Sequence, residues 1–432
     1  MPPMEDDSHS HGRCENDAVN RSIQLRWPQV SSVAVDRRVG LTLDVHTTEP
    51  GLKPEGQAGL VVQGDAEASL GAILADDGLG PRYRNKVQLC YVDPPFNRGD
   101  RFGQYDDTLG RAEWLSMLRG SLQQSKQFLT ETGSIWVHLD DAAQHHGRCL
   151  LDEVFGEDAF VATVIWQRRT TRDNRKAFSA MHDYIHVYAP CGPKRWKQVR
   201  NPLPDLGSFS NPDNDPRGPW RSVPMTVQAG HATKSQFYTV ETPAGSRHDP
   251  PPGRCWTFTK DRLEQLIAAE RVYWPRNGHG KPRLKRFRHE VEGVAPFTIW
   301  PAEDVGNTST AKKEILALVS GLPRFDTPKP ERLLERIISV GSDPGDLVLD
   351  FFLGSGTTAA VAQKMGRQWV GIDLSQTTLE TCTLPRLKKV VAGTDGIGIT
   401  RYPESMANGF EVARLSTTSA TGIEDGSELE SA

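Results

Sequence analysis

The hydrophobic and polar positions of the chain alternate between two periods. Short apolar runs, typical of buried strands, cover residues 60–62, 87–92, 134–139, 160–167, 183–189, 347–350 and 368–372. Between them, apolar residues recur three and four positions apart, which predicts helices over 66–74, 114–128, 141–155, 311–319, 329–340, 359–365 and 379–390. Gly133 is expected to end the second of these helices. Strands that alternate with helices indicate an α/β fold with a doubly wound, mostly parallel sheet.

The alternation breaks off between residues 193 and 300. Proline and glycine punctuate this stretch, aromatic residues are scattered through it, and only Lys260–Ala269 has clear helical spacing. We therefore predict an inserted module at 193–300. The remaining regions are an irregular N-terminal segment at 1–55, a sheet domain in two parts at 56–192 and 301–395, and an acidic tail at 396–432 that we expect to be disordered.

The charge of the chain is unevenly distributed. Its formal net charge is −4, yet residues 160–300 hold 23 Lys and Arg against 12 Asp and Glu, a local net of +11 that leaves −15 for the rest. A basic region inside an acidic chain is typical of a segment that contacts phosphates, although a solvated basic face gives the same count. Two clusters supply the candidate phosphate-binding residues Arg168, Arg169, Arg172, Arg175, Lys176, Lys281, Arg283, Lys285, Arg286 and Arg288.

Composition excludes several classes of protein. No apolar run approaches the roughly 18 residues of a membrane span, and the N-terminus has neither a signal peptide's apolar segment nor the arginine bias of a transit peptide. The six cysteines contain no C-x-x-C pair, which argues against a zinc site or a disulfide framework. We predict a cytoplasmic protein without a bound metal.

A small polar clamp follows the apolar run at 87–92. Asp93 comes first, and the strand must end there because Pro94 and Pro95 cannot donate to a sheet ladder. Asp93 and the carbonyl of Pro94 can each accept an N–H from the exocyclic amine of a nucleobase, while Phe96 can stack on its ring. The alternative is a capped strand end followed by an ordinary loop.

A second candidate site follows the run at 347–350. Gly354 and Gly356 allow a tight turn before a helix, and Asp373 stands about twenty residues on, where a carboxylate can hold ribose hydroxyls. Alone, this layout also fits an NAD enzyme. Ligands of open α/β sheets bind outside the carboxyl ends of the strands, so this turn and the clamp are expected to face one crevice. A cofactor beside an extruded base would then give group transfer to an exocyclic amine.

The order of these motifs resembles that of the β class of S-adenosylmethionine-dependent DNA amino methyltransferases. In that class the catalytic tetrad comes first, here Asp93-Pro94-Pro95-Phe96, and the cofactor motif comes last, here Phe352-x-Gly354-x-Gly356. Further runs, including WVHLDD at 136–141 and DYIHVY at 183–188, are similar to adenine-specific members related to the Mod subunits of type III restriction systems.

The resemblance implies a Rossmann-like N6-adenine DNA methyltransferase whose catalytic part is 56–192, whose target-recognition region is 193–300 and whose cofactor-binding part is 301–395. Asp93, Pro94 and Phe96 would hold the flipped base. The implied S-adenosyl-L-methionine site comprises Asp65, Lys329, Asp350, Phe352, Gly354, Ser355, Gly356, Thr357 and Asp373. Within it, Asp65 would approach the adenine, Lys329 the carboxylate and Asp373 the ribose. The chain departs from the family pattern at Phe96, where Tyr is commoner, and at Leu353, where Ala is usual.

The resemblance also implies double-stranded DNA as substrate, at the nucleoid of a prokaryotic cell, and suggests a separate restriction subunit and a homodimer as partners. N4-cytosine methylation is the nearest alternative, since the same clamp can hold that amine, but Ser usually replaces Asp93 in that branch. A catalytically silent DNA-binding paralogue also stays open. An NAD-dependent dehydrogenase would need a catalytic His, Lys or Tyr set that the sequence does not indicate.

Overall fold

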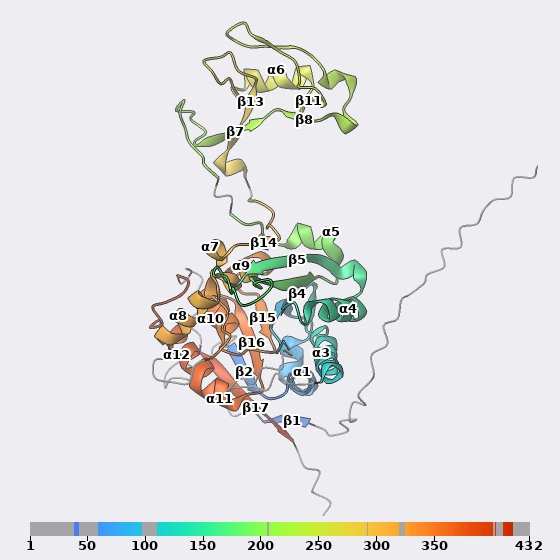
Figure 1. The fold of residues 1–432 in the computed structure, drawn as a ribbon, viewed down its shortest axis with the longest axis vertical. Coiled ribbons are helices and arrows are strands. Elements are labelled where there is room, and N and C mark those ends of the chain that lie inside the picture. Colours follow the sequence, from blue (N-terminus) through green and yellow to red (C-terminus); the bar gives the residue numbers. More distant parts are fainter. Residues whose placement is uncertain are drawn as a thin grey trace, which may run out of the picture.

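The computed structural model describes residues 39–42, 59–96, 110–204, 207–291, 293–318, 325–400, 402 and 409–417. These residues form a sheet domain and a module that stands apart from it, joined by two extended segments (Figure 1). The central sheet has ten strands within the described residues, in the order β1-β17-β2-β16-β15-β3-β4-β6-β5-β14. No helix in this part of the chain is long and apolar enough to cross a membrane.

Most neighbouring strands of the sheet run parallel. The strands are β1 (Val39–Thr42), β2 (Gly59–Gln63), β3 (Val87–Val92), β4 (Leu129–Leu139), β5 (Phe160–Gln167), β6 (His182–Tyr188), β14 (Ile299–Trp300), β15 (Leu347–Asp350), β16 (Gln368–Asp373) and β17 (Phe410–Thr417). Within the described part of this sheet, only the pairs β1–β17, β4–β6 and β5–β6 are antiparallel. The predicted mostly parallel α/β fold is confirmed.

Helices cover both faces of the sheet. One face carries α1 (Ala66–Ala75), α2 (Leu79–Tyr83), α3 (Arg111–Ser125) and α4 (Gln144–Phe155), whose apolar side chains form one core with the sheet. The other carries α5 (Gly192–Val199), α7 (Ala302–Val305), α9 (Glu331–Gly341), α10 (Thr357–Lys364) and α12 (Leu384–Ala392). In addition, α8 (Thr308–Leu318) packs against α12, and α11 (Gln376–Thr378) continues through a π-helical turn, Leu379–Thr383, into α12.

The direction of chain winding reverses between β15 and β3, which lie side by side in the sheet. From β15 the chain passes through α10 to β16 on one side, whereas from β3 it passes through α3 to β4 on the other. Such a switch point opens a crevice at the carboxyl ends of the two strands, where ligands of doubly wound sheets bind.

Part of the predicted disordered tail belongs to the sheet. Residues 410–417 form β17, which pairs with β2 in parallel and with β1 antiparallel, so the prediction of a disordered segment was wrong for them. Phe410 and Ala413 are buried because they face the core, although the strand as a whole is too polar to reveal itself. The predicted N-terminal segment at 1–55 lies outside the described residues except for β1.

Two predicted boundaries also shift. The helix expected to end at Gly133 ends at Ser125, and Gly133 lies inside β4, where a Cβ atom would come within 2.8 Å of the carbonyl oxygen of Val87. That glycine therefore marks a close approach of two strands. Helix α5 begins at Gly192 and buries Trp196 in the core of the sheet domain, within the stretch assigned to the module.

The inserted module has its own small core. It contains β7 (Trp220–Pro224), β8 (Thr226–Gln228), β9 (Val240–Glu241), β10 (Arg247–His248), β11 (Arg254–Trp256), α6 (Lys260–Ala268), β12 (Val272–Tyr273) and β13 (Arg283–Phe287). Trp256 is buried with Met225, Leu263 and Val272, so this aromatic serves packing. Two segments connect the module to the sheet domain (Figure 1). Leu203 in the first and Val294 in the second form an antiparallel bridge.

Candidate active site

A cavity of about 470 Å³ lies where β15 and β3 end. Its volume falls within the roughly 300 to 1,000 Å³ that is usual for ligand pockets. Twelve of the predicted site residues line it: Asp65, Asp93, Pro94, Pro95, Phe96, Lys329, Asp350, Phe352, Gly354, Ser355, Thr357 and Asp373. The clamp and the glycine turn, far apart in sequence, therefore share one crevice.

Asp93 follows β3 directly and has two unlike carboxylate oxygens. Its Oδ2 forms an ion pair with Nζ of Lys329, whereas its Oδ1 is buried and accepts no hydrogen bond from any described residue. A buried acceptor without a donor is costly, so Oδ1 is suited to an N–H brought in by a ligand. Lys329, which the resemblance placed beside a cofactor carboxylate, thus contacts the clamp in this structure.

Phe96 lies against a group of buried polar side chains that sequence reasoning missed. Its ring stacks on that of His138, with the ring centroids 6.0 Å apart. Nδ1 of His138 is hydrogen-bonded to the hydroxyl of Tyr91 at 2.9 Å, and its Nε2 lies 3.4 Å from Oδ2 of Asp183. Asp183 also forms an ion pair with Arg168 at 2.9 Å. The sequence signal was the presence of His138 and Asp183 within the largely apolar runs at 134–139 and 183–189.

The glycine turn after β15 needs glycine at two positions. Gly354 and Gly356 have φ angles of 51° and 75°, in the left-handed region that disfavours side chains. A Cβ atom on Gly354 would lie 3.0 Å from the ring of Phe325, and one on Gly356 would lie 2.9 Å from Thr383. Gly356 is the N-cap of α10 and is the one predicted cofactor residue that does not line the cavity.

The bulk of Leu353 does not disrupt this turn. Leu353 is only 4% exposed and belongs to the core on the α10 face of the sheet. Its side chain lies over Gly371 of β16, where a Cβ atom would come within 2.5 Å of Leu353 Cδ2. Because Gly371 has no side chain, Leu353 fits at the position where the family usually has Ala.

Two buried carboxyl groups border the turn. Burial raises the pKa of Asp350 to about 7, although hydrogen bonds from the hydroxyl of Thr358 and the amide of Phe352 partly oppose the shift. Burial likewise raises the pKa of Asp373 to about 6, against hydrogen bonds from the amides of Ser375 and Gly354. Both carboxylates are poorly solvated, so a cationic ligand in the cavity would favour their ionised forms.

A buried ion network supports the turn from behind. Arg386 donates to the hydroxyl of Thr357 at 2.8 Å and to the carbonyl of Ser355 at 3.3 Å. Glu331 holds Arg386 and Lys364 through its two oxygens, each at 2.8 Å. These charged residues come from three helices, so no local motif could have identified them.

Asp65 stands at the rim of the cavity and has a structural role as well. Its side chain accepts a hydrogen bond from the amide of Ala68 at 2.9 Å and so caps the N-terminus of α1. The helix begins directly after β2, which places Asp65 at the same sheet edge as Asp93 and Asp373. This position is compatible with the predicted contact to a cofactor.

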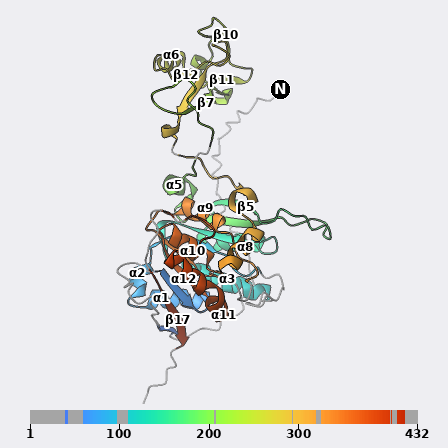
Figure 2. The same ribbon diagram turned by 90° about the vertical axis from the view of Figure 1, so that its left-hand side faces the viewer.

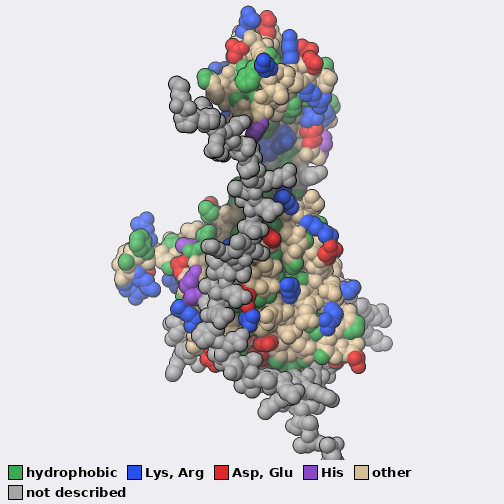
Figure 3. Space-filling model, turned by 90° about the vertical axis from the view of Figure 1, so that its right-hand side faces the viewer, with side chains coloured by type: hydrophobic (Ala, Val, Ile, Leu, Met, Phe, Trp, Pro, Cys, Tyr) green, Lys and Arg blue, Asp and Glu red, His purple; other side chains and the backbone are tan. Residues whose placement is uncertain are grey.

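The first basic cluster lies on the connection between β5 and β6. This connection projects from the sheet domain (Figure 2), and Lys and Arg side chains gather on the projection (Figure 3). Arg169, Arg172 and Lys176 are exposed there, and Arg175 is exposed while paired with Asp173 at 2.8 Å. Arg168 differs, because its ion pair with Asp183 holds it in the wall behind Phe96.

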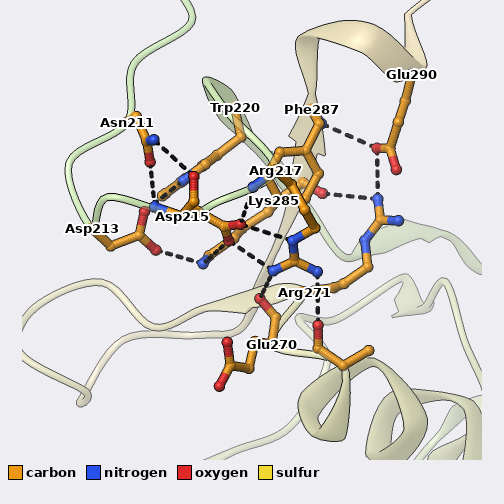
Figure 4. A network of polar contacts seen from close by, with 11 residues as sticks. Asn211, Asp213, Asp215, Arg217, Trp220, Glu270, Arg271, Lys285, Phe287 and Glu290 are labelled. Carbon is orange, nitrogen blue, oxygen red and sulfur yellow. Dashed lines mark hydrogen bonds and ion pairs between the residues drawn. The ribbon is translucent and has the colours of Figure 1, made fainter.

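The second basic cluster falls on β13, where side chains alternate between the two faces. Lys281, Arg286 and Arg288 are exposed, whereas Lys285 points inward. Its ammonium group pairs with the carboxylates of Asp213 and Asp215 at 2.5 and 2.9 Å (Figure 4).

Arg283, the remaining cation of this cluster, forms hydrogen bonds within the module. Arg283 donates to the hydroxyl and the carbonyl of Ser222 at 2.9 and 3.0 Å. Because their charges are neutralised within the fold, Lys285 and Arg168 leave the set that we expect to contact phosphates.

Comparisons with known proteins show the family to which the chain is related. The family model of DNA methylases matches residues 87–383, more than half of the chain. The Mod subunit of the type III restriction-modification enzyme StyLTI from Salmonella typhimurium strain LT2 is 32% identical over 335 residues, which cover 70% of this chain and 49% of that protein. The type II methyltransferase M.EcaI from Enterobacter cloacae is 30% identical over 302 residues, which cover 67% of this chain and 62% of that protein.

The chain thus spans about half to three-fifths of the length of these curated relatives. Among solved structures, the PvuII DNA methyltransferase, described as cytosine-N4-specific, is similar over 84% of this chain and 100% of its own, with 12% identity and a TM-score of 0.44.

Proposed function

The chain belongs to the DNA methylase family, and on that premise we propose that it transfers a methyl group from S-adenosyl-L-methionine to N6 of adenine in double-stranded DNA. The observation that carries the proposal is the shared cavity, which both the carboxylate of Asp93 and the glycine turn at Gly354 line. Group transfer needs two reactants held in line within one site, which accounts for much of the acceleration.

The residues present fit the proposed cofactor. S-adenosyl-L-methionine would supply a methyl group on a cationic sulfonium, and the cavity wall contains the carboxyl groups of Asp350 and Asp373. The backbone of the turn at Gly354 can approach a ligand closely because no side chain stands in the way. Asp373, at the end of β16, would hold the ribose, and Phe352 would border the methionine end.

The clamp would act on the base. Oδ1 of Asp93 and the carbonyl of Pro94 would each accept one N–H of the exocyclic amine, which keeps its lone pair out of conjugation with the ring. Transfer would form a bond from the nitrogen to the methyl carbon while the carbon–sulfur bond breaks, and Oδ1 of Asp93 would accept the proton that the nitrogen loses. Phe96 would stack on the flipped base, and Lys329 would hold Oδ2 so that Oδ1 faces the amine.

DNA would be held by cations outside the cavity. The proposed phosphate contacts are Arg169, Arg172, Arg175, Lys176, Lys281, Arg283, Arg286 and Arg288. The first four lie on the projection between β5 and β6, and the others lie on or beside β13 of the module. A separate restriction subunit and a second copy of the chain are proposed partners, because type III Mod subunits are among the relatives.

N4-cytosine methylation is the second candidate, since the clamp can accept either exocyclic amine. Asp93 at the head of the tetrad favours adenine. The test is to incubate the protein with unmethylated genomic DNA and cofactor labelled on the methyl group, then digest the DNA to nucleosides and weigh them. Labelled N6-methyl-2′-deoxyadenosine supports the proposal, labelled N4-methyl-2′-deoxycytidine supports the alternative, and no label supports a silent DNA-binding paralogue.

A further inference from the structure

The catalytic aromatic side chain rests on a histidine to which no role has yet been given. His138 lies one residue before the end of β4, and its side chain is fully buried. The rings of Phe96 and His138 are inclined by 28°, with centroids 6.0 Å apart, which is a stacked arrangement. Phe96 itself lines the cavity. One ring of the proposed base platform therefore lies on a second ring that is fixed in the sheet.

Several contacts fix the plane of His138. The hydroxyl of Tyr91 donates to Nδ1 at 2.9 Å, and Nε2 faces Oδ2 of Asp183 at 3.4 Å. With its proton on Nε2, the ring can donate to Asp183 while Nδ1 accepts from Tyr91. The ring of Trp166 meets that of His138 edge-on, at 85° and 5.4 Å between centroids. The imidazole can therefore not rotate without losing both hydrogen bonds.

Asp183 is held in its ionised form. Burial alone would raise its pKa, but the hydrogen bond with His138 and the charges of Arg168 and Lys329 lower it below its usual value. Its second oxygen pairs with Arg168 at 2.9 Å. Arg168 directly precedes the exposed basic segment that projects between β5 and β6. His138, Asp183 and Arg168 thus form a continuous chain of contacts from Phe96 to the start of that segment.

We propose that His138 is a positioning residue for methyl transfer, which holds the ring of Phe96 in the orientation on which the flipped base stacks. Asp183 keeps His138 in that orientation. This inference rests on the proposed function. A buried polar group that served stability alone would not need to contact a ring that lines the reaction cavity.

The test compares His138→Leu with a matched control, His186→Leu. His186 is also buried in the sheet, on β6, and it hydrogen-bonds to the hydroxyl of Thr163 at 3.0 Å and to the carbonyl of Gln144 at 3.2 Å. It does not line the cavity. Both variants lose an imidazole and its hydrogen bonds, but only His138→Leu removes the support of Phe96.

Each variant is assayed on an unmethylated duplex that contains the sequence which the wild-type protein methylates. We expect His138→Leu to lower kcat by about tenfold or more, because a small misplacement of a reactant is costly, while the Kd for S-adenosyl-L-methionine stays within twofold. Emission from 2-aminopurine at the target position should change as well. His186→Leu should keep the wild-type kcat, and His138→Phe, which restores a flat ring, should recover part of the loss.

Asp183→Asn provides a second route should His138→Leu fail to fold, and it should lower kcat in the same direction by a smaller factor. Wild-type kcat in His138→Leu, or in a folded Asp183→Asn when His138→Leu does not fold, would overturn the inference. An equal loss in His186→Leu would overturn it too, since it would indicate general damage. If the wild-type protein itself transfers no methyl group to any DNA, the proposed function fails first and takes this inference with it.

Discussion

Buried carboxylates occur in both the sheet domain and the inserted module, but their surroundings differ. In the module, Asp215 is enclosed by Arg217 and Lys285, and its hydrogen bonds to Arg217 lower its pKa well below the usual value (Figure 4). In the sheet domain, burial raises the pKa of Asp350 to about 7 and of Asp373 to about 6. Asp93 keeps one buried oxygen without a donor among the described residues.

The difference distinguishes carboxylates that stabilise the fold from carboxylates that can bind a ligand. A buried carboxylate that is fully paired within the protein is already satisfied and has nothing to offer a ligand. A carboxylate that is desolvated or incompletely paired pays a cost that a bound cation or donor relieves, and such groups gather at functional sites. The sheet domain holds the second kind around one cavity, and the module holds the first kind in its interior.

Replacing Asp93 should have the largest effect. In Asp93→Ala the amine loses its main acceptor, so we expect methyl transfer to fall by on the order of 10³-fold. Affinity for S-adenosyl-L-methionine should change little, because the glycine turn is untouched. Transfer measured with labelled cofactor and affinity measured by calorimetry check the two halves separately. Transfer at the wild-type rate would remove the central role given to the clamp.

Replacing Asp373 should give the opposite pattern. Asp373→Ala removes the proposed ribose contact and leaves the amide of Gly354 without its acceptor at 2.7 Å. We expect the cofactor Kd to rise by about 10- to 100-fold, or roughly 1.4 to 2.8 kcal/mol, while kcat at saturating cofactor falls far less than in Asp93→Ala. Equal losses of kcat in the two variants would contradict the division of roles.

The pH dependence of cofactor binding should be moderate. A sulfonium cation favours the ionised forms of Asp350 and Asp373, whose raised pKa values of about 7 and about 6 leave them partly protonated at acidic pH. Affinity should therefore increase as the pH rises from 5 to 8, and then level off. For each proton released on binding, the increase is about tenfold or less per pH unit. Calorimetry across this range tests it, and Asp373→Ala should flatten the lower part of the curve.

Replacing either of two neighbouring cations on β13, Lys285 or Arg286, should change a different property: stability for the first and DNA binding for the second. Lys285→Met leaves Asp215 short of a partner, so we expect a melting temperature several degrees lower and little change in the salt dependence of DNA binding. Arg286→Met, on the exposed face, should keep the melting temperature and reduce the slope of log K against log salt by about one. The reverse result would mean that the two faces of β13 have been assigned the wrong way round.

Much of the sheet domain could be predicted from periodicity because its strands are buried on both faces. Leu347–Asp350 and Phe160–Gln167 form β15 and β5 with the expected bounds. The clamp and the turn could be found because proline and glycine restrict or extend the backbone in ways that a sequence displays. Strand β17 could not, because its partners are β1 and β2, hundreds of residues away.

The residues that contact the clamp and the turn from outside could not be predicted for a similar reason. His138 and Asp183 meet because β4 and β6 pair antiparallel, with His138 opposite Ile185. Lys329 reaches Asp93 across the cavity, and Arg386 reaches the turn from α12. Each contact depends on the register of distant strands or on helix packing, and neither is written in a local motif.

The module leaves and rejoins the sheet domain through one pair of residues, Leu203 and Val294, which lie opposite each other. Because entry and exit coincide, exchanging everything between them for another small domain disturbs no strand register in the central sheet. We therefore expect a chain in which another small domain replaces the stretch between Leu203 and Val294 to keep its central sheet and the cavity at the ends of β15 and β3.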